Sequence, residues 1–353
     1  MEVAVEAANG SSWEGKASEK NQRLSEKKPF RRFEQEGSAE EEEERLLDEE
    51  EGDMRVWLSY SRYYERYINH HYGSCEDTTS VRPMRYTKGP IPSYACCDHA
   101  LQIFSVQVME AKDGLEWPLH VYGWVATRDS IDRKRNFLFN RTRDNCQILT
   151  QQDSYLLLTG PSRAVVLIDP VTFQVELKVK VGGDFEDKLL SLKVFEHHKL
   201  PPYQYKPCLI HKRLSSKRSM IEVTYATFYE TVEASVVSVQ VTDGSWPDHL
   251  RGRVVCRTTG IEEGDIVLLD SRDGRMPLTC DGAIELSRHV FSAELRRPVK
   301  IDVVASQVSD NTCVAAAARA VFRPKKARSS HGTCDLGFCK VEITVAWSLL
   351  SWN

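Results

Sequence analysis

The chain has 353 residues, 41% of them hydrophobic and 28% charged, and its formal net charge is −4. No apolar run approaches the roughly 20 residues that a membrane-spanning helix needs, and residues 1–53 lack the apolar core of a secretory signal. These features exclude integral membrane proteins and fibrous or low-complexity classes. We therefore expect a soluble globular protein, intracellular and either cytoplasmic or nuclear, whose cysteines are free thiols.

Charge divides the chain into two unequal parts. Residues 1–53 hold eight basic and seventeen acidic residues, including the run Glu40–Glu44, whereas the remainder holds 39 basic and 34 acidic residues. A segment this charged and poor in apolar residues cannot bury enough surface to offset the entropy lost on ordering. We therefore predict a disordered acidic tail over residues 1–53, attached to a basic body.

A helix and a linker are predicted to follow the tail. In residues 54–70 the large side chains recur at the spacing of one helical stripe. This stripe consists of Trp57, Tyr60, Tyr64, Tyr67 and Ile68. Aromatic residues at this spacing more often pack on a protein body than hold a ligand, so we predict a docking helix. The prolines and glycine of residues 71–100 then indicate a linker.

From about residue 100 the pattern becomes that of β-strands. Residues 173–181 alternate apolar and polar side chains, as do residues 340–347, which is typical of half-buried antiparallel strands. Shorter candidate strands lie at 103–109, 120–127, 136–139, 154–158, 164–168, 220–228, 235–241, 266–269 and 299–305. Because turn residues separate them and no long amphipathic helix intervenes, we predict an all-β fold.

The body contains an internal repeat. Residues 117–128 and 246–257 share Trp-Pro, His, Gly, Val and Arg at a constant offset of 129. Of the 34 columns that begin at residue 117, ten are identical, whereas random pairing at ~6% per column gives about two. We therefore predict two tandem homologous β-sandwich-like repeats, over residues 101–219 and 220–353.

Five arginines are candidate binding residues. Arg128 and Arg143 recur in the second copy as Arg257 and Arg272, and Arg163 ends a Thr-Gly-Pro-Ser-Arg turn. Backbone N–H groups, a hydroxyl and a guanidinium in one turn suit an anion, although a tight hairpin turn explains the same sequence. Residues kept in both copies are explained more readily by shared folding than by one active site.

No known metal or catalytic motif emerges from the sequence. Cys96-Cys97-Asp98-His99 holds ligand residue types without the spacing of a zinc site, and Cys334 and Cys339 have no second matching pair. No nucleophile, base and orienting group occur at a recognised spacing. We therefore expect no metal, no cofactor and no catalytic residue.

Two basic segments, residues 206–218 and 319–328, are candidate phosphate contacts. Basic loops are also ordinary solvated surface, and no aromatic RNA-binding signature accompanies them. Nucleic-acid binding is therefore only a weak candidate function.

Four stretches carry a resemblance to a known family: residues 121–129, 135–139, 141–147 and 158–165, which read VYGWVATRD, RNFLF, RTRDNCQ and LTGPSRAV. Over about residues 54–353 the chain resembles an uncharacterised plant domain of unknown function that is expanded in grasses. In some members the domain follows a jasmonate-induced, ribosome-inactivating N-glycosidase domain, which implies a stress or defence association. The N-glycosidase motif needs Glu before Ala-Ala-Arg, and Ala316 stands there instead, so we expect no depurinating activity.

These observations predict a non-catalytic interaction module that binds an unknown protein partner and does not insert into a membrane. Two alternatives stay open. One is an RNA- or ligand-binding protein that uses the groove between the β repeats, and the other is an enzyme with an unrecognised site.

Overall fold

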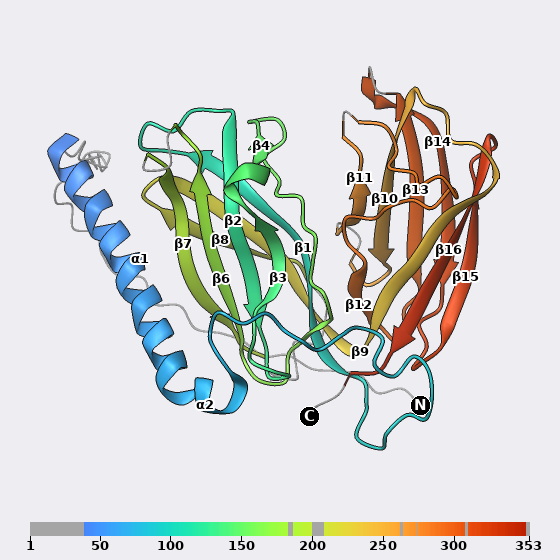
Figure 1. Cartoon of the computed structure of the whole chain (residues 1–353), viewed down its shortest axis with the longest axis horizontal. Coiled ribbons are helices and arrows are strands. Elements are labelled where there is room, and N and C mark those ends of the chain that lie inside the picture. Colours follow the sequence, from blue (N-terminus) through green and yellow to red (C-terminus); the bar gives the residue numbers. More distant parts are fainter. Residues whose placement is uncertain are drawn as a thin grey trace, which may run out of the picture.

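The computed structural model describes residues 39–182, 186–199, 208–261, 264–272, 274–307 and 310–350 (Figure 1). Its helices are α1 (Ala39–Tyr67), α2 (Asn69–Tyr72) and the short 3-10 helix η1 (Arg143–Asn145). The strands before β9 are β1 (Asp98–Ala111), β2 (Leu119–Arg128), β3 (Asn136–Arg141), β4 (Gln147–Leu149), β5 (Val165–Val166), β6 (Val171–Val179), β7 (Lys188–His197) and β8 (Ile210–Ser216). The others are β9 (Ser219–Gly244), β10 (Leu250–Thr258), β11 (Ile266–Asp270), β12 (Val290–Glu294), β13 (Val299–Gln307), β14 (Asp310–Phe322), β15 (Ser329–Asp335) and β16 (Cys339–Ser348).

The strands form three antiparallel sheets arranged as two packed halves. In the first half, the sheet β3-β2-β6-β7, with β4 on β2, packs against β1, β5, β8 and the beginning of β9. In the second half, the sheet β11-β10-β13-β14 packs against β12, β15, β16 and the end of β9. The prediction of a mostly β protein is confirmed, and the alternating segment 173–181 forms most of β6.

Strand β9 belongs to both halves. Its beginning pairs with β1 and β8, for example Tyr225 with Ile103, and its end pairs with β12 and β16, for example Val239 with Ile343. Figure 1 shows the strand passing from one half into the other. The expected boundary between residues 219 and 220 is therefore wrong, because side chains such as Ile221 pack into the first core. The change of half occurs near Glu230, which has a positive φ of 48°.

The two halves pair their strands in the same order. β2 pairs with β3 and β6, and β6 pairs with β7; likewise β10 pairs with β11 and β13, and β13 pairs with β14. β1 pairs with β5 as the end of β9 pairs with β12, and β8 precedes its partner β9 as β15 precedes β16. The repeated tryptophans, Trp117 and Trp246, occupy the same place, directly before β2 and β10.

Helix α1 lies along the outer face of the β3-β2-β6-β7 sheet (Figure 1). The ring of Trp57 lies 5.6 Å from that of Trp124 on β2, and Tyr64 is buried beneath the guanidinium of Arg128 at 4.6 Å. The docking role expected for this stripe matches these contacts, except that Tyr67 is 56% exposed. Among described residues, none forms a helix that is both long and apolar enough to cross a membrane.

The helix begins earlier than expected, at Ala39 rather than at residue 54. The prediction of a disordered tail is therefore wrong for its last part, and residues 1–38 lie outside the described residues. Ion pairs attach this part to the body: Asp53 lies 2.5 Å from Lys193, and Glu50 lies 3.1 Å from Arg218. The acidic stretch is helical where basic side chains of the body face it.

Candidate binding cleft

A cleft of about 960 Å³ lies between the two halves. The first half contributes residues of β1, β4, β8 and β9 and of the segment 150–158, and the second half contributes β10, β11 and the residues that follow them. Small-molecule and peptide sites are typically concave spaces of about 300–1,000 Å³. The cleft is therefore large enough to enclose part of a ligand, and both halves are needed to form it.

The first-half wall is partly apolar. Ile148 is 54% exposed and Tyr155 is 47% exposed, and Leu157 and Leu209 line the same wall. Exposed side chains of this size lose contact with water when a ligand covers them, which favours binding of apolar groups. This wall can therefore supply affinity for an apolar portion of a ligand.

The second-half wall is charged. Arg253 on β10 lies 3.6 Å from Asp265 and 3.6 Å from Asp270, beyond the length of a good hydrogen bond. Its buried Nε has no hydrogen-bond partner among the described residues. Arg251 lies two positions earlier on the same strand and also lines the cleft. The wall thus offers guanidinium donors together with carboxylate acceptors.

Arg272 connects the halves across the cleft. Its Nη1 lies 2.5 Å from a carboxylate oxygen of Asp153, and its Nη2 donates to the backbone oxygen of Tyr155 at 3.2 Å. Burial lowers the pKa of the neighbouring Arg141, and the positive charge of Arg272 lowers it further. Arg272 therefore holds the second half against the loop that contains Asp153.

Glu222 adds a carboxylate on the first-half side. Burial by itself raises the pKa of Glu222, but hydrogen bonds from Arg213 and His211, at 3.0 Å each, outweigh it and lower the pKa overall. The carboxylate therefore stays ionised at neutral pH. With it, the lining holds four carboxylates, from Asp153, Glu222, Asp265 and Asp270, beside three arginines, so its charge is nearly balanced.

Two of the five candidate arginines are buried and hold the fold together. Arg163 is 2% exposed and forms a bidentate ion pair with Asp129, at 2.6 and 2.9 Å. Arg128 is also 2% exposed; it donates to Gln174 at 2.7 Å and to the backbone oxygen of Cys75. Neither guanidinium is accessible to a ligand in this structure.

The other three candidates are at least partly accessible. Arg143 pairs with Asp187 at 2.6 Å, and Arg257 pairs with Asp265 at 2.6 Å. Only Arg272 lines the cleft, so the structure does not bring the five together. Sequence reasoning missed Arg251 and Arg253, whose alternate spacing on a predicted strand was the available signal.

Within the described part of the chain, no three His, Cys, Asp or Glu side chains cluster closely enough to hold a metal ion. The chemistry that the cleft offers is therefore hydrogen bonding, ion pairing and apolar contact from protein side chains.

Comparison with known proteins identifies a family. The family profile described as "Domain of unknown function (DUF6598)" matches residues 100–345. No curated protein matches the sequence.

Similar solved structures are distant. One, human GIVD cytosolic phospholipase A2, is 10% identical with a TM-score of 0.22, and the match covers 74% of this chain and 33% of the phospholipase chain. Another, the tandem pair of C2-type domains of Extended-Synaptotagmin 2, is 7% identical with a TM-score of 0.25, and the match covers 78% of this chain and 99% of that one. Similarity at this level carries no inference about function.

Proposed function

We propose that this chain, which belongs to the family of the domain of unknown function DUF6598, is a non-catalytic interaction module that binds a segment of a protein partner in the cleft between its halves. The observation that carries the proposal is the cleft itself, at about 960 Å³, with an apolar wall facing a wall of guanidinium and carboxylate groups. A polypeptide segment offers both apolar side chains and backbone hydrogen-bonding groups, which this lining complements.

The balance of charge in the cleft favours a polypeptide over RNA. The carboxylates of Asp153, Glu222, Asp265 and Asp270 line the space in which a phosphate backbone would lie. Each phosphate would have to approach these anions, which opposes the electrostatic attraction on which RNA binding depends. We therefore favour a protein partner over the RNA-binding alternative.

The contacts of the sequence motifs support a non-catalytic role. Arg319, the arginine closest to an N-glycosidase motif, donates to Asp302 at 2.5 and 2.9 Å, and the preceding Ala316 pairs with Ala305 within the β13–β14 ladder. These residues form part of a regular sheet. A release assay with intact ribosomes tests this part of the proposal, and we expect no free adenine.

The cleft is tested by selecting peptides from a random display library on the purified chain. We expect selected peptides to bind by calorimetry with micromolar affinity and to bind Ile148→Arg at least about tenfold more weakly, because the new cation removes apolar contact from the cleft wall. Val321→Arg is the matched control: Val321 is 59% exposed, compared with 54% for Ile148, and lies outside the cleft. Peptides that bind both variants as tightly as the native chain would contradict the proposal, as would a selection that yields none.

We also infer that the two halves arose by duplication, which the shared strand order and the 129-residue sequence offset support. Ser-Arg-x-Val occurs at Arg163 and again at Arg288, and at the offset of 129 Asp129 corresponds to Thr258. Arg288 is buried, and none of its guanidinium nitrogens has a hydrogen-bond partner among the described residues. The second half thus retains the buried arginine where the sequence has lost its carboxylate partner.

The plant origin, the stress or defence association and the intracellular location remain predictions from the sequence. Measuring transcript levels after jasmonate treatment would test the first two in any plant that carries the gene. Locating a fluorescent fusion in the same plant would test the third.

A further inference from the structure

Two segments far apart in the sequence carry basic residues and no acidic ones. Residues 80–97 contain three basic residues and residues 321–334 contain four, whereas neither range contains Asp or Glu. Their basic residues are Arg82, Arg85, Lys88, Arg323, Lys325, Lys326 and Arg328. We call the surface formed by these two segments the basic end.

Hydrogen bonds hold the two segments side by side. The backbone N–H of Arg328 donates to the backbone oxygen of Thr87 at 3.0 Å, and that of Trp347 donates to the backbone oxygen of Arg328 at 2.8 Å. The hydroxyl of Thr87 donates to the backbone oxygen of Trp347 at 2.9 Å, which closes the connection. Burial raises the pKa of Cys97, and Lys326 opposes this rise, so the ammonium group lies near Cys97. The positive charges therefore belong to one surface.

The basic side chains of this surface are exposed and lack carboxylate partners. All seven are classed as exposed, and none forms an ion pair with a described carboxylate. Two have neutral contacts instead: Arg85 lies over the ring of Tyr86 at 5.4 Å, and Lys325 donates to the backbone oxygen of Ser329 at 3.3 Å. By contrast, the nearby Arg296 pairs with Glu230 at 3.0 Å. The positive charge of the basic end is thus not neutralised within the described chain.

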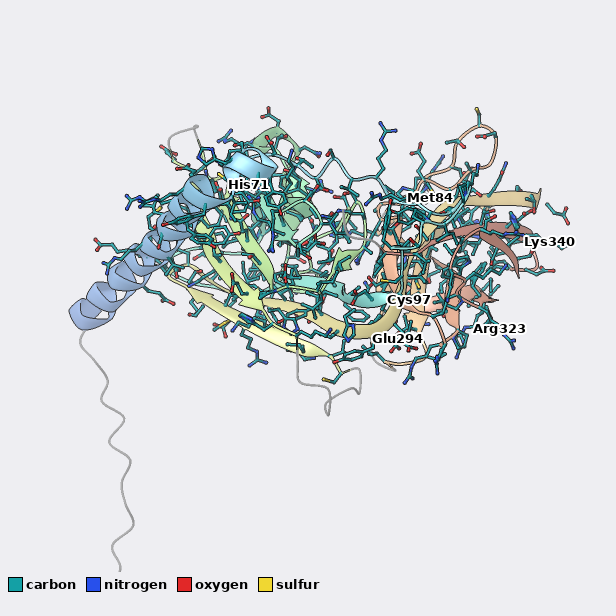
Figure 2. All side chains as sticks on the ribbon, turned by 90° about the horizontal axis from the view of Figure 1, so that it is seen from below. His71, Met84, Cys97, Glu294, Arg323 and Lys340 are labelled. Carbon is teal, nitrogen blue, oxygen red and sulfur yellow. The ribbon has the colours of Figure 1, made fainter. Side chains whose placement is uncertain are left out.

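Large apolar side chains protrude among these charges. Met84 is 39% exposed, Ile91 is 43% exposed and Tyr94 is 53% exposed, all in the segment between α2 and β1. In Figure 1 this segment makes a loop that projects at the lower end of the molecule. Figure 2, seen from below, places Met84, Cys97 and Arg323 over the second half, away from α1. The apolar tips and the basic groups therefore face the same side.

We infer that the basic end adsorbs to the surface of an anionic lipid bilayer, with Met84, Ile91 and Tyr94 entering the headgroup region while the surrounding cations contact lipid phosphates and carboxylates. Basic residues close to a membrane are attracted by its negative surface potential. Exposed apolar side chains gain by leaving water at the bilayer interface. This contact is peripheral and independent of the cleft.

The apolar tips distinguish a lipid surface from a nucleic acid. An RNA backbone would satisfy the cations but would leave Met84 and Ile91 in water, because sequence-tolerant RNA binding uses aromatic stacking rather than aliphatic contacts. A bilayer interface accommodates both kinds of side chain. The lipid surface therefore accounts for more of the observed groups than RNA does.

The test is co-sedimentation of the full chain with vesicles of phosphatidylcholine alone and of phosphatidylcholine with phosphatidylserine at about 3:1. We expect binding only to the serine-containing vesicles at about 0.1 M salt, and release at about 0.5 M salt, because salt screens exposed charges. The double variant Lys325→Glu, Lys326→Glu should bind at least about tenfold more weakly. Ile91→Ser with Tyr94→Ser should also bind about tenfold more weakly, since the apolar contribution is lost.

Arg275→Glu with Lys340→Glu is the matched control, since it reverses two exposed charges that lie outside the basic end. It should bind serine-containing vesicles as the native chain does, and thermal melts of every variant check that it is folded. Equal binding to both vesicle types, no binding to either, or unchanged binding of the lysine variant would overturn the inference. So would tight binding of poly(U) that displaces the vesicles and depends on Lys325 and Lys326, which would identify a nucleic-acid surface instead.

Discussion

Replacing Asp129 with Asn should destabilise the chain strongly, because it breaks a buried ion pair at one end of the first half. The carboxylate of Asp129 and the guanidinium of Arg163 are 1% and 2% exposed. Besides Arg163, Asp129 accepts hydrogen bonds from the backbone N–H groups of Val166 at 2.9 Å and Ile131 at 3.1 Å. An Asn amide group at one of these positions would direct its own N–H groups at existing donors.

The size of the effect follows from burial and from the remaining partner. Burial alone lowers the pKa of Arg163, but the charges of Asp129 and Asp132 outweigh it and raise the pKa. Arg163 therefore keeps its charge, and removing one partner of a buried pair costs about 3–5 kcal/mol. Asp132, at 3.0 Å from Arg163, remains as a second carboxylate. We therefore expect a loss near the lower limit, about 3 kcal/mol.

The assay is chemical denaturation followed by fluorescence and circular dichroism, with the free energy of unfolding compared between variants. Asp169→Asn makes the same substitution at a more exposed pair, because Asp169 is 44% exposed and lies 2.7 Å from Arg133. That variant should lose less than about 1 kcal/mol. Asp129→Leu with Arg163→Met should lose less than Asp129→Asn, because no buried charge is left alone. If Asp129→Asn and Asp169→Asn prove equally stable, the reasoning from burial is refuted.

Three further substitutions test other parts of the structure. Trp57→Ala should remove the contact that docks α1 and reduce the free energy of unfolding by about 2 kcal/mol, whereas Tyr63→Ala, at a 55% exposed position, should change it little. Burial lowers the pKa of His197 to about 4, below the unfolded value of about 6.5, so protonation favours the unfolded state. As pH falls from about 6.5 to 4, the native chain should lose up to about 3 kcal/mol more than His197→Gln, and parallel pH profiles of unfolding would contradict this. Thr258→Asp should stabilise the second half by supplying Arg288 with a carboxylate, and a lower melting temperature would show that the two residues do not meet.

Local sequence patterns predicted the individual strands better than their connections. The alternation at 173–181 was visible because one face of β6 contacts the core, and period-two patterns report such contact directly. The continuity of β9 was not visible, because its two ends pack in different cores and the pattern breaks around Glu230. The start of α1 was missed because the pairs of Glu50 and Asp53 involve partners more than 100 residues away.

The cleft was less predictable than the sheets for the same reason. A groove between the repeats could be anticipated from the duplication alone, but not which residues would line it. Arg163 lies 34 residues from its partner Asp129, and nothing in the local sequence distinguishes this buried arginine from the accessible Arg272. Pairing between distant residues decides which guanidinium is used for stability and which remains at a surface.

Strand β9 also determines the order in which the chain can fold as it is synthesised. Strand β1 leaves the ribosome long before its partner, since Ala100 pairs with Phe228, and until then it has only the two residues of β5 beside it. The first half is therefore complete only when β9 has emerged. Its other end, from Thr231 onward, then presents an unpaired ladder on which β12 and β16 assemble. Long-range pairing of this kind slows folding, and a nascent chain of this protein should need protection of the β1 edge until residue 228 has been added.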